Sequence, residues 1–310
     1  MEFFKRQTSI DFLGVRKGAL GLSLFLIIGS LYFLADRGLN FGIDFTGGVL
    51  IEIGYPDNAM LGGVRDILAD QGFDSATVQH FGTLRDVLIR LQPQDETSSA
   101  EISERLLAAL RRSDAGVEMR RVEFVGPQVG DELKSAGGNA TLVALLMILA
   151  YVSMRFQWKL AVGAVAALAH DVIITLGYFA LFGIAFDLTV LAALLAVIGY
   201  SLNDTIVVFD RIRENFRFMR KVDAISVANA SINQTMSRTI MTGLTTMLVL
   251  VALFYFGGEA IHVFALALMI GVIIGTYSSI YIASTVSVML GVTKQDLLPV
   301  KKEGRVDDLP

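Results

Sequence analysis

The residues best suited to chemistry in this sequence are carboxyls set inside strongly apolar runs. Asp204 has apolar residues on both sides and lies about six residues, or roughly 9 Å at helical rise, from the charged end of its run. An ionisable group at that depth in a membrane is costly, usually faces a helix bundle and marks a pathway. Burial favours the neutral carboxyl, whereas a nearby arginine favours the ionised one. We therefore predict that Asp204 loads and releases protons; the alternative is a static packing hydrogen bond or a water-exposed helix end.

Several residues close to Asp204 in sequence or in depth support this prediction. Asn203 and Thr205 flank it with hydrogen-bonding groups, and Gly199 permits close approach of another helix. Arg238 opens the next apolar run from the same side, which gives it a similar depth on an antiparallel helix. Because arginine stays protonated, we expect Arg238 to act as a counter-charge rather than as a proton carrier. The alternative for Arg238 is an ordinary membrane-surface anchor.

A second acidic position lies in the preceding apolar run. Asp171, with His170 beside it, is roughly 16 Å from the start of that run at helical rise. Adjacent side chains on a helix point about 100° apart, so the two residues need not cooperate. Either one fits an interhelical polar contact, and both are also candidates for a role in transport.

The sequence gives no support to several other chemistries. Cysteine is absent, and the three histidines, at positions 80, 170 and 262, have no metal-ligand spacing. There is no phosphate-binding loop, no H-E-x-x-H and no G-x-S-x-G motif, so neither a built-in ATP motor nor an intramembrane metalloprotease is expected. A net charge of −4 gives no nucleic-acid footprint. We therefore predict a protein that is not an enzyme and has no cofactor or metal site.

The elements that must position these residues are membrane-spanning helices. Hydrophobic residues make up 54% of the chain and charged residues only 18%, which is typical of a polytopic α-helical membrane protein. The first apolar run follows basic residues, but it exceeds the ~7–15 residues of a signal peptide and ends without a small-residue cleavage site. By the length criterion, six runs are long enough to span a bilayer: 18–36, 136–154, 160–182, 188–209, 238–256 and 263–290.

The distribution of basic residues predicts the orientation of these spans. Sixteen of the 26 lysines and arginines fall in the tails 1–17 and 291–310, in the short loop after the second span, in the loop 210–237 and at Arg238 directly after it. The positive-inside rule therefore predicts that both termini are cytoplasmic and that 37–135 lies on the opposite side. The basic run that begins the 210–237 loop suits an amphipathic helix on the anionic inner leaflet.

The segment 37–135 is long enough to be a domain and changes its pattern several times. Alternating and helical periods follow one another in the order βαββαβ, which predicts a small α+β, ferredoxin-like domain between the first two spans. The expected strands are 49–55, 77–81, 87–91 and 117–125, and the expected helices are 61–71 and 101–112.

Five separated motifs resemble one known family. They are GIDFTGG at 42–48, FVGPQVG at 124–130, AHDVI at 169–173, GYSLNDTIVV at 199–208 and DRIREN at 210–215. In this order they resemble the SecF family, the smaller membrane subunits of bacterial SecDF complexes. The resemblance extends from the first span to Leu290, and no charged position departs from the family pattern.

The resemblance implies a function and partners. SecF pairs with SecD, each with six spans, in a twelve-helix body similar to RND-superfamily transporters. The complex associates with the SecYEG translocon, with SecA and accessory subunits nearby, and uses the proton-motive force to promote export of preproteins across the bacterial inner membrane. By this resemblance Asp204 is a proton-relay residue, Arg238 is the matching arginine, and a further carboxylate belongs to SecD.

The glycine-rich motifs stand where the 37–135 segment joins the spans. Glycine allows sharp turns and close contacts, and proline fixes a turn, so these positions fit tight junctions that transmit motion, or turns that are purely structural. The junction positions are Gly42, Asp44, Thr46, Gly47, Gly48, Gly126, Pro127 and Gly130.

Two other functions remain as alternatives. One is half of an RND-type small-molecule exporter, which the small size of the 37–135 segment disfavours. The other is a structural subunit that stabilises its partners without transport. An export assay separates the second alternative from a proton-driven export subunit.

Overall fold

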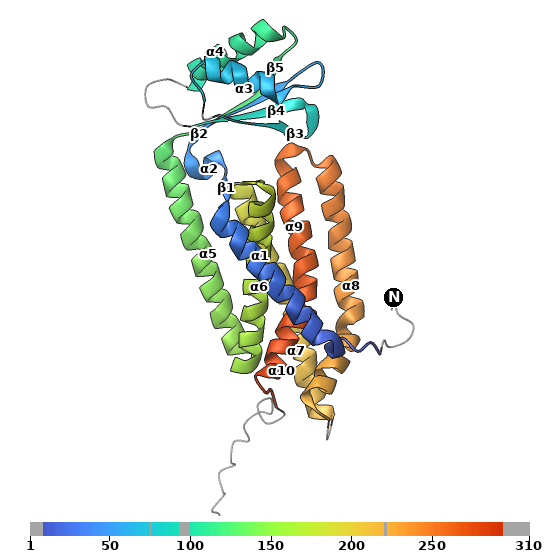
Figure 1. Cartoon of the computed structure of the whole chain (residues 1–310). Coiled ribbons are helices and arrows are strands. Elements are labelled where there is room, and N and C mark those ends of the chain that lie inside the picture. The colour runs from blue at the N-terminus through green and yellow to red at the C-terminus, as the bar shows by residue number, and fades with distance from the viewer. Residues whose placement is uncertain (1–8, 75, 93–98, 220–221, 294–310) are drawn as a thin grey trace, which may run out of the picture.

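The chain forms a helical bundle with a small α+β domain at one end (Figure 1). The computed structural model describes residues 9–74, 76–92, 99–219 and 222–293. Residues 1–8 of the predicted N-terminal tail (1–17) and residues 294–310 of the predicted C-terminal tail (291–310) therefore lie outside the described residues. Within the described residues, six helices are long and apolar enough to cross a membrane, which agrees with the predicted fold class.

The bundle consists of long helices and one irregular segment. The first spanning helix starts with a 3-10 turn, η1 (Leu13–Val15), and the last one contains a π-helical turn, η2. The helices are α1 (Arg16–Asp36), α5 (Pro127–Arg155), α6 (Trp158–Phe182), α7 (Leu188–Phe218), α8 (Ala224–Phe256), α9 (Glu259–Ser278), η2 (Ser279–Ala283) and α10 (Ser284–Met289).

The helices extend beyond the apolar runs in two places. α5 starts at Pro127, nine positions before the predicted span, because Gly126 is its N-cap and Pro127 fits the first helical turn. The predicted loop 210–237 is mostly helical, since α7 continues to Phe218 and α8 begins at Ala224. Apolar length measures only the part of a helix that suits lipid, so it misses helical ends that are polar or amphipathic.

α7 lies at the centre of the bundle. It packs against α6, α8 and α9, while α1 crosses α6, and α5 stands apart on one side (Figure 1). In their most apolar windows, α6 is 61% and α7 50% buried, whereas α5 is 6% and α8 11% buried. The chain therefore has its own core around α6, α7 and α9, and it presents α5 and α8 to lipid or to another protein.

The α+β domain has the predicted ferredoxin-like topology. Its antiparallel sheet has the order β3-β4-β2-β5, and α3 and α4 cover the face turned away from the bundle (Figure 1). Val49, Ile51 and Ile53 alternate along β2 and point into this core, where Leu68 and Leu106 are buried. The elements are β2 (Gly48–Gly54), α3 (Leu61–Asp70), β3 (Thr77–Phe81), β4 (Thr83–Leu91), α4 (Ser99–Ser113) and β5 (Glu118–Val125).

Two short strands join this domain to the bundle. β1 (Asn40–Phe41) follows α1 and pairs in parallel with β6 (Ala185–Phe186), which lies between α6 and α7. The one-turn helix α2 (Ile43–Thr46) then leads from β1 into β2. The domain is therefore attached to the bundle at the α6–α7 connection as well as through its own chain ends.

Candidate functional site

α7 positions Asp204 inside the bundle. The residue is 3% exposed even without a partner chain, and its Oδ2 is a buried atom without a hydrogen-bond partner among the described residues. One turn away, the buried hydroxyl oxygen of Tyr200 also has no such partner. An unpartnered carboxylate oxygen in an apolar interior is unfavourable when ionised, so this site favours the neutral carboxyl unless a cation or water approaches.

The two residues that flank Asp204 lie in different surroundings. Thr205 is buried, and its Oγ1 is 2.9 Å from Oγ of Ser279 on η2. Ser279 Oγ in turn donates to the carbonyl oxygen of Ser201 at 3.3 Å. Asn203, in contrast, is exposed on the outside of this chain, as is Gly199. Consecutive helical residues differ by about 100°, so the helix separates Thr205 from Asn203 onto an inner and an outer face.

The helix that faces Thr205 is irregular at this point. Residues Ser279–Ala283 form a π-helical turn between α9 and α10, and this turn packs against α7. Such turns interrupt the regular hydrogen-bond ladder and occur frequently at functional sites. The turn therefore places an adaptable backbone segment next to the part of α7 that carries Asp204.

Arg238 does not form a direct ion pair with Asp204 among the described residues. It is exposed on α8, although its charge is close enough to act on the Asp204 carboxyl. Matched depth along antiparallel helices thus brings the two residues into the same region, but the rotation of α8 turns the arginine outward. The guanidinium is free to approach the acid only through a side-chain or helix movement.

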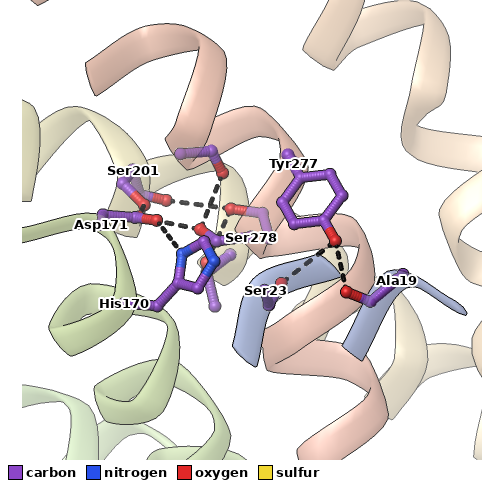
Figure 2. Close-up of polar contacts among 10 residues, drawn as sticks. Ala19, Ser23, His170, Asp171, Ser201, Tyr277 and Ser278 are labelled. Carbon is purple, nitrogen blue, oxygen red and sulfur yellow. Dashed lines mark hydrogen bonds and ion pairs between the residues drawn. The ribbon is translucent and has the colours of Figure 1, made fainter. Parts of the chain in front are cut away.

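Asp171 lies at the centre of a dense polar cluster (Figure 2). Its Oδ2 accepts hydrogen bonds from Ser201 Oγ at 2.5 Å and Ser278 Oγ at 2.8 Å, and its Oδ1 is 3.0 Å from His170 Nδ1. The cluster is fully buried and joins α6, α7 and α9. Although adjacent helical residues need not cooperate, His170 and Asp171 contact each other here.

The cluster continues toward α1 through an aromatic residue. The ring of Tyr277 stacks on His170 with centroids 6.0 Å apart. Its hydroxyl donates to the Ala19 carbonyl oxygen at 2.7 Å and accepts from Ser23 at 3.1 Å (Figure 2). No local sequence motif marks Tyr277 or Ser23 as members of a polar network. The one signal in the sequence is that each is a polar residue within an apolar run.

The two buried acids therefore differ in what they can do. Asp171 is held by three side chains, so its carboxylate is stabilised in place and orients neighbouring helices. Asp204 retains a buried oxygen without a partner among the described residues and forms no direct ion pair with Arg238, which suits a group that gains and loses a proton. The described residues contain no cluster of acidic or histidine side chains that could hold a metal ion.

The glycine motifs meet at the junction of the α+β domain and the bundle. A Cβ on Gly130 would lie 2.7 Å from the Gly47 nitrogen, so α5 contacts α2 closely only because Gly130 has no side chain. Gly47 and Gly48 have φ angles of 68° and 122°, a region that favours glycine. Gly126 has a negative φ, and no described atom lies within 4 Å of an added Cβ, so neither backbone conformation nor close packing requires glycine at this position.

Asp44 and Thr46, the polar residues of the first junction motif, make hydrogen bonds to the backbone. Asp44 is half-buried and its Oδ2 accepts a hydrogen bond from the Leu188 backbone nitrogen at 3.0 Å. The Thr46 hydroxyl donates to the carbonyl oxygen of Gly42 at 3.1 Å. Both side chains therefore stabilise the path of the chain from β1 to β2.

Comparison with known families defines the class of protein. The family model described as the C-terminal region of the protein export membrane proteins SecD and SecF matches residues 105–293, and the SecD/SecF GG motif matches residues 32–55. The chain belongs to the SecD/SecF family of protein export membrane proteins.

Within that family, full-length relatives identify the subunit type as SecF, a translocase subunit rather than an enzyme. The chain is 52% identical to the protein translocase subunit SecF of Vibrio alginolyticus over 100% of this chain and 99% of that one. It is 44% identical to the Escherichia coli O157:H7 SecF over 97% of this chain and 94% of that one.

A solved structure has the same fold. The crystal structure of SecDF, a translocon-associated membrane protein from Thermus thermophilus, matches with a TM-score of 0.84 and 36% identity. The match covers 93% of this chain and 39% of the SecDF chain, so this chain spans well under half of that protein. The remaining part of SecDF has no counterpart here, which implies a SecD partner.

Proposed function

We propose that this chain is the SecF part of a SecDF complex that uses the proton-motive force to promote protein export in association with the SecYEG translocon. The observation that carries this proposal is Asp204, a buried acid with an unpartnered oxygen on the central helix of the bundle. A purely structural subunit has no need of such a group, because an unsatisfied buried polar atom lowers stability. The full-length SecF relatives disfavour a small-molecule exporter.

The free energy available from the membrane potential is comparable to the cost of ionising one buried acid. Moving an elementary charge across a membrane potential is worth about 2.3 kcal/mol per 100 mV. Burying an ionised carboxylate costs several kcal/mol unless it is paired. Loss of a proton from Asp204 therefore favours a bundle in which the Arg238 guanidinium or water reaches the carboxylate, and regain of the proton favours the dry arrangement.

Asp171 takes a second role in this proposal. Its three side-chain partners come from α6, α7 and α9, so it keeps the helix that carries Asp204 in register with its neighbours. His170 bridges this cluster to Tyr277 and hence to α1. A proton that arrives at Asp204 therefore acts on helices that are already linked by hydrogen bonds.

The outer face of α7 supports a SecD contact beside Asp204. Gly199 and Asn203 are one helical turn apart and exposed, which combines a small residue with an amide. Residues of this kind allow two membrane helices to approach and to hydrogen-bond. We also propose that α5 and α8, which have little burial in this chain, contact SecD or lipid.

The orientation belongs to the same proposal. Both termini are cytoplasmic and the α+β domain faces the outside of the cytoplasmic membrane, where it is available to an emerging preprotein. The charge distribution supports this orientation, because Arg16, Arg155 and Arg217 lie at the ends of α1, α5 and α7 that are remote from the α+β domain.

The test compares two substitutions on one helix. Asp204→Asn keeps the shape of the side chain and removes its titration, so we expect loss of the stimulation of preprotein export that depends on the proton gradient. Asp210→Asn is the matched control, because Asp210 is also on α7 but is 42% exposed and pairs with Arg155 at the end of the bundle. Export into inverted vesicles is measured for complexes that contain equal amounts of both subunits.

We expect Asp210→Asn to retain most of the stimulation. Full stimulation by an assembled Asp204→Asn complex would contradict the relay. A second measurement, proton uptake by proteoliposomes with the purified complex, separates loss of proton movement from loss of preprotein handling.

A further inference from the structure

A small set of polar contacts ties the sheet of the α+β domain to the bundle. The Nη1 atom of Arg90, on β4, donates to Asn40 Oδ1 at 2.9 Å and to the Phe41 carbonyl oxygen at 3.0 Å. Both acceptors belong to β1. Asn40 then uses its Nδ2 to donate to the Gly183 carbonyl oxygen at 2.8 Å, at the end of α6. One side chain of the sheet thus reaches the α6–α7 connection through one intermediate residue.

The next contacts reach the first turn of α7. The Gly42 nitrogen donates to the Phe186 carbonyl oxygen at 2.8 Å, which extends the β1–β6 pairing. A Cβ on Gly42 would lie 3.0 Å from the Asp187 Cβ, so the absence of a side chain allows this approach. Asp44 Oδ2 accepts from the Leu188 nitrogen at 3.0 Å, one of the helix-start N–H groups that lack a partner within α7.

Charge reinforces the same contacts. Burial lowers the pKa of the Arg90 guanidinium, and the carboxylates of Asp187 and Asp44 partly oppose this effect. The three charges therefore share one partly buried region at the start of α7. A positive charge on the sheet and two negative charges beside the helix start attract each other more strongly there than in water.

Around Arg90, the sheet and the junction are not joined by continuous apolar packing. A cavity of about 390 Å³ lies between the sheet and the junction, lined by Arg90, Asn40, Thr46 and Thr77 among others. The contact between domain and bundle therefore combines specific hydrogen bonds on the Arg90 side with an apolar cluster, in which Phe41 and Phe45 pack against Phe186. Contacts of this kind transmit a displacement in a defined direction, whereas the cavity leaves the surrounding surfaces free to adjust.

We propose that Arg90, Asn40 and Asp44 form a clamp that fixes the α+β domain to the start of α7 throughout the working cycle. This inference rests on the proposed function, because α7 also carries Asp204. A shift or rotation of α7 that follows protonation is then passed to the domain through the β1–β6 pair. The three residues are positioning residues: they hold no proton of the relay and transmit movement from it.

The first test separates transmission from proton movement. Arg90→Gln and Asp44→Ala, in the full complex with its SecD partner, are expected to lower export stimulation about threefold or more, since each removes a hydrogen bond between the domain and the bundle. Proton uptake by the same proteoliposomes is expected to stay near the wild-type rate. The matched control is Arg65→Gln, because Arg65 also donates to a carbonyl oxygen, that of Val78, but inside the domain.

The absence of cysteine allows a second, covalent test. Phe41 and Phe186 are register partners in the β1–β6 pair, and Phe41 gives the clamp only its backbone carbonyl oxygen, so Phe41→Cys with Phe186→Cys is suited to a disulfide. A permanent clamp predicts equal export by the oxidised and reduced forms. Loss of export on oxidation, reversed by reduction, would show that β1 and β6 must separate, and it would overturn the proposal.

The outcomes distinguish this inference from the proposed function. Asp204→Asn tests the relay through proton uptake, whereas Arg90→Gln tests the clamp through the ratio of export to proton uptake. Unchanged export in both Arg90→Gln and Asp44→Ala would overturn the clamp alone. An equal fall in export and proton uptake would also overturn it, because it would make these residues general supports of the fold.

Discussion

At the residue scale, two buried aspartates only 33 positions apart in the sequence have opposite surroundings. Asp171 accepts two serine hydrogen bonds and contacts a histidine, whereas Asp204 leaves one oxygen without a partner among the described residues. A carboxylate with several donors is stabilised where it lies, and a carboxyl without them is sensitive to any approaching charge. In the proposed function the two acids therefore divide support and proton handling between them.

The Asp171 cluster predicts a graded effect of serine substitutions. Ser278→Ala removes a hydrogen bond to a buried carboxylate, so we expect the free energy of unfolding to fall by about 1.5–3 kcal/mol. Ser284→Ala is the control, because Ser284 is equally buried but donates to a backbone carbonyl oxygen, and a cost of about 0.5–1.5 kcal/mol is expected. Thermal unfolding of the purified complex measures both. Equal losses would show that Asp171 does not depend on Ser278.

At the element scale, close helix contacts depend on a few glycines. A Cβ on Gly177 of α6 would lie 2.6 Å from the Ser30 Cα of α1, and one on Gly163 would lie 2.6 Å from the Ala283 carbonyl oxygen of η2. Membrane helices that lack a strong hydrophobic driving force gain stability from such close packing. α6 is therefore positioned by small residues at both of these contacts.

The close contact between α1 and α6 predicts that a single added methyl group on Gly177 lowers stability. Gly177→Ala forces the two helices apart, and overpacking of this kind costs about 1–3 kcal/mol, so a lower unfolding temperature of the complex is expected. Gly29→Ala is the control on the facing helix, since no atom of the part of the chain that the structure describes lies within 4 Å of its added Cβ. Blue native electrophoresis verifies that both variants assemble. An unchanged unfolding temperature for Gly177→Ala would contradict the close contact.

At the scale of the whole molecule, the chain is an incomplete bundle with a domain attached at one end. α5 and α8 expose rows of large apolar residues, including Leu146, Met147 and Leu248, which must be covered by lipid or by a partner. The clamp contacts the start of α7 through Asp44, whereas Asp204 lies further along the same helix. Function therefore depends on a partner that completes the bundle without disturbing α7.

The proposed orientation is tested with single cysteines, because the chain has none of its own. Leu84→Cys lies in the α+β domain and Phe218→Cys at the far end of α7, and these side chains are 58% and 74% exposed. A membrane-impermeant maleimide is expected to label Leu84→Cys in spheroplasts and Phe218→Cys only after the membrane is permeabilised. The reverse pattern would contradict the orientation.

The sequence by itself determined the features that depend on local pattern. Apolar length predicted six spanning helices, alternation predicted the ferredoxin-like domain, and isolated acids within apolar runs marked Asp204 and Asp171. It predicted a helix for the basic run that begins at residue 210, which forms the end of α7, but it did not predict the helical starts of α5 and α8, because polar and amphipathic turns remain helical outside lipid.

Only the tertiary structure decided which residues meet. Each helical residue turns the side-chain direction by about 100°, so depth along a helix says nothing about which face a side chain occupies. For that reason Arg238 and Asn203 turn outward, while His170 and Ser278 converge on Asp171. The link from Arg90 through Asn40 to the start of α7 joins segments far apart in the chain, and such contacts exist only once the helices and the sheet have packed.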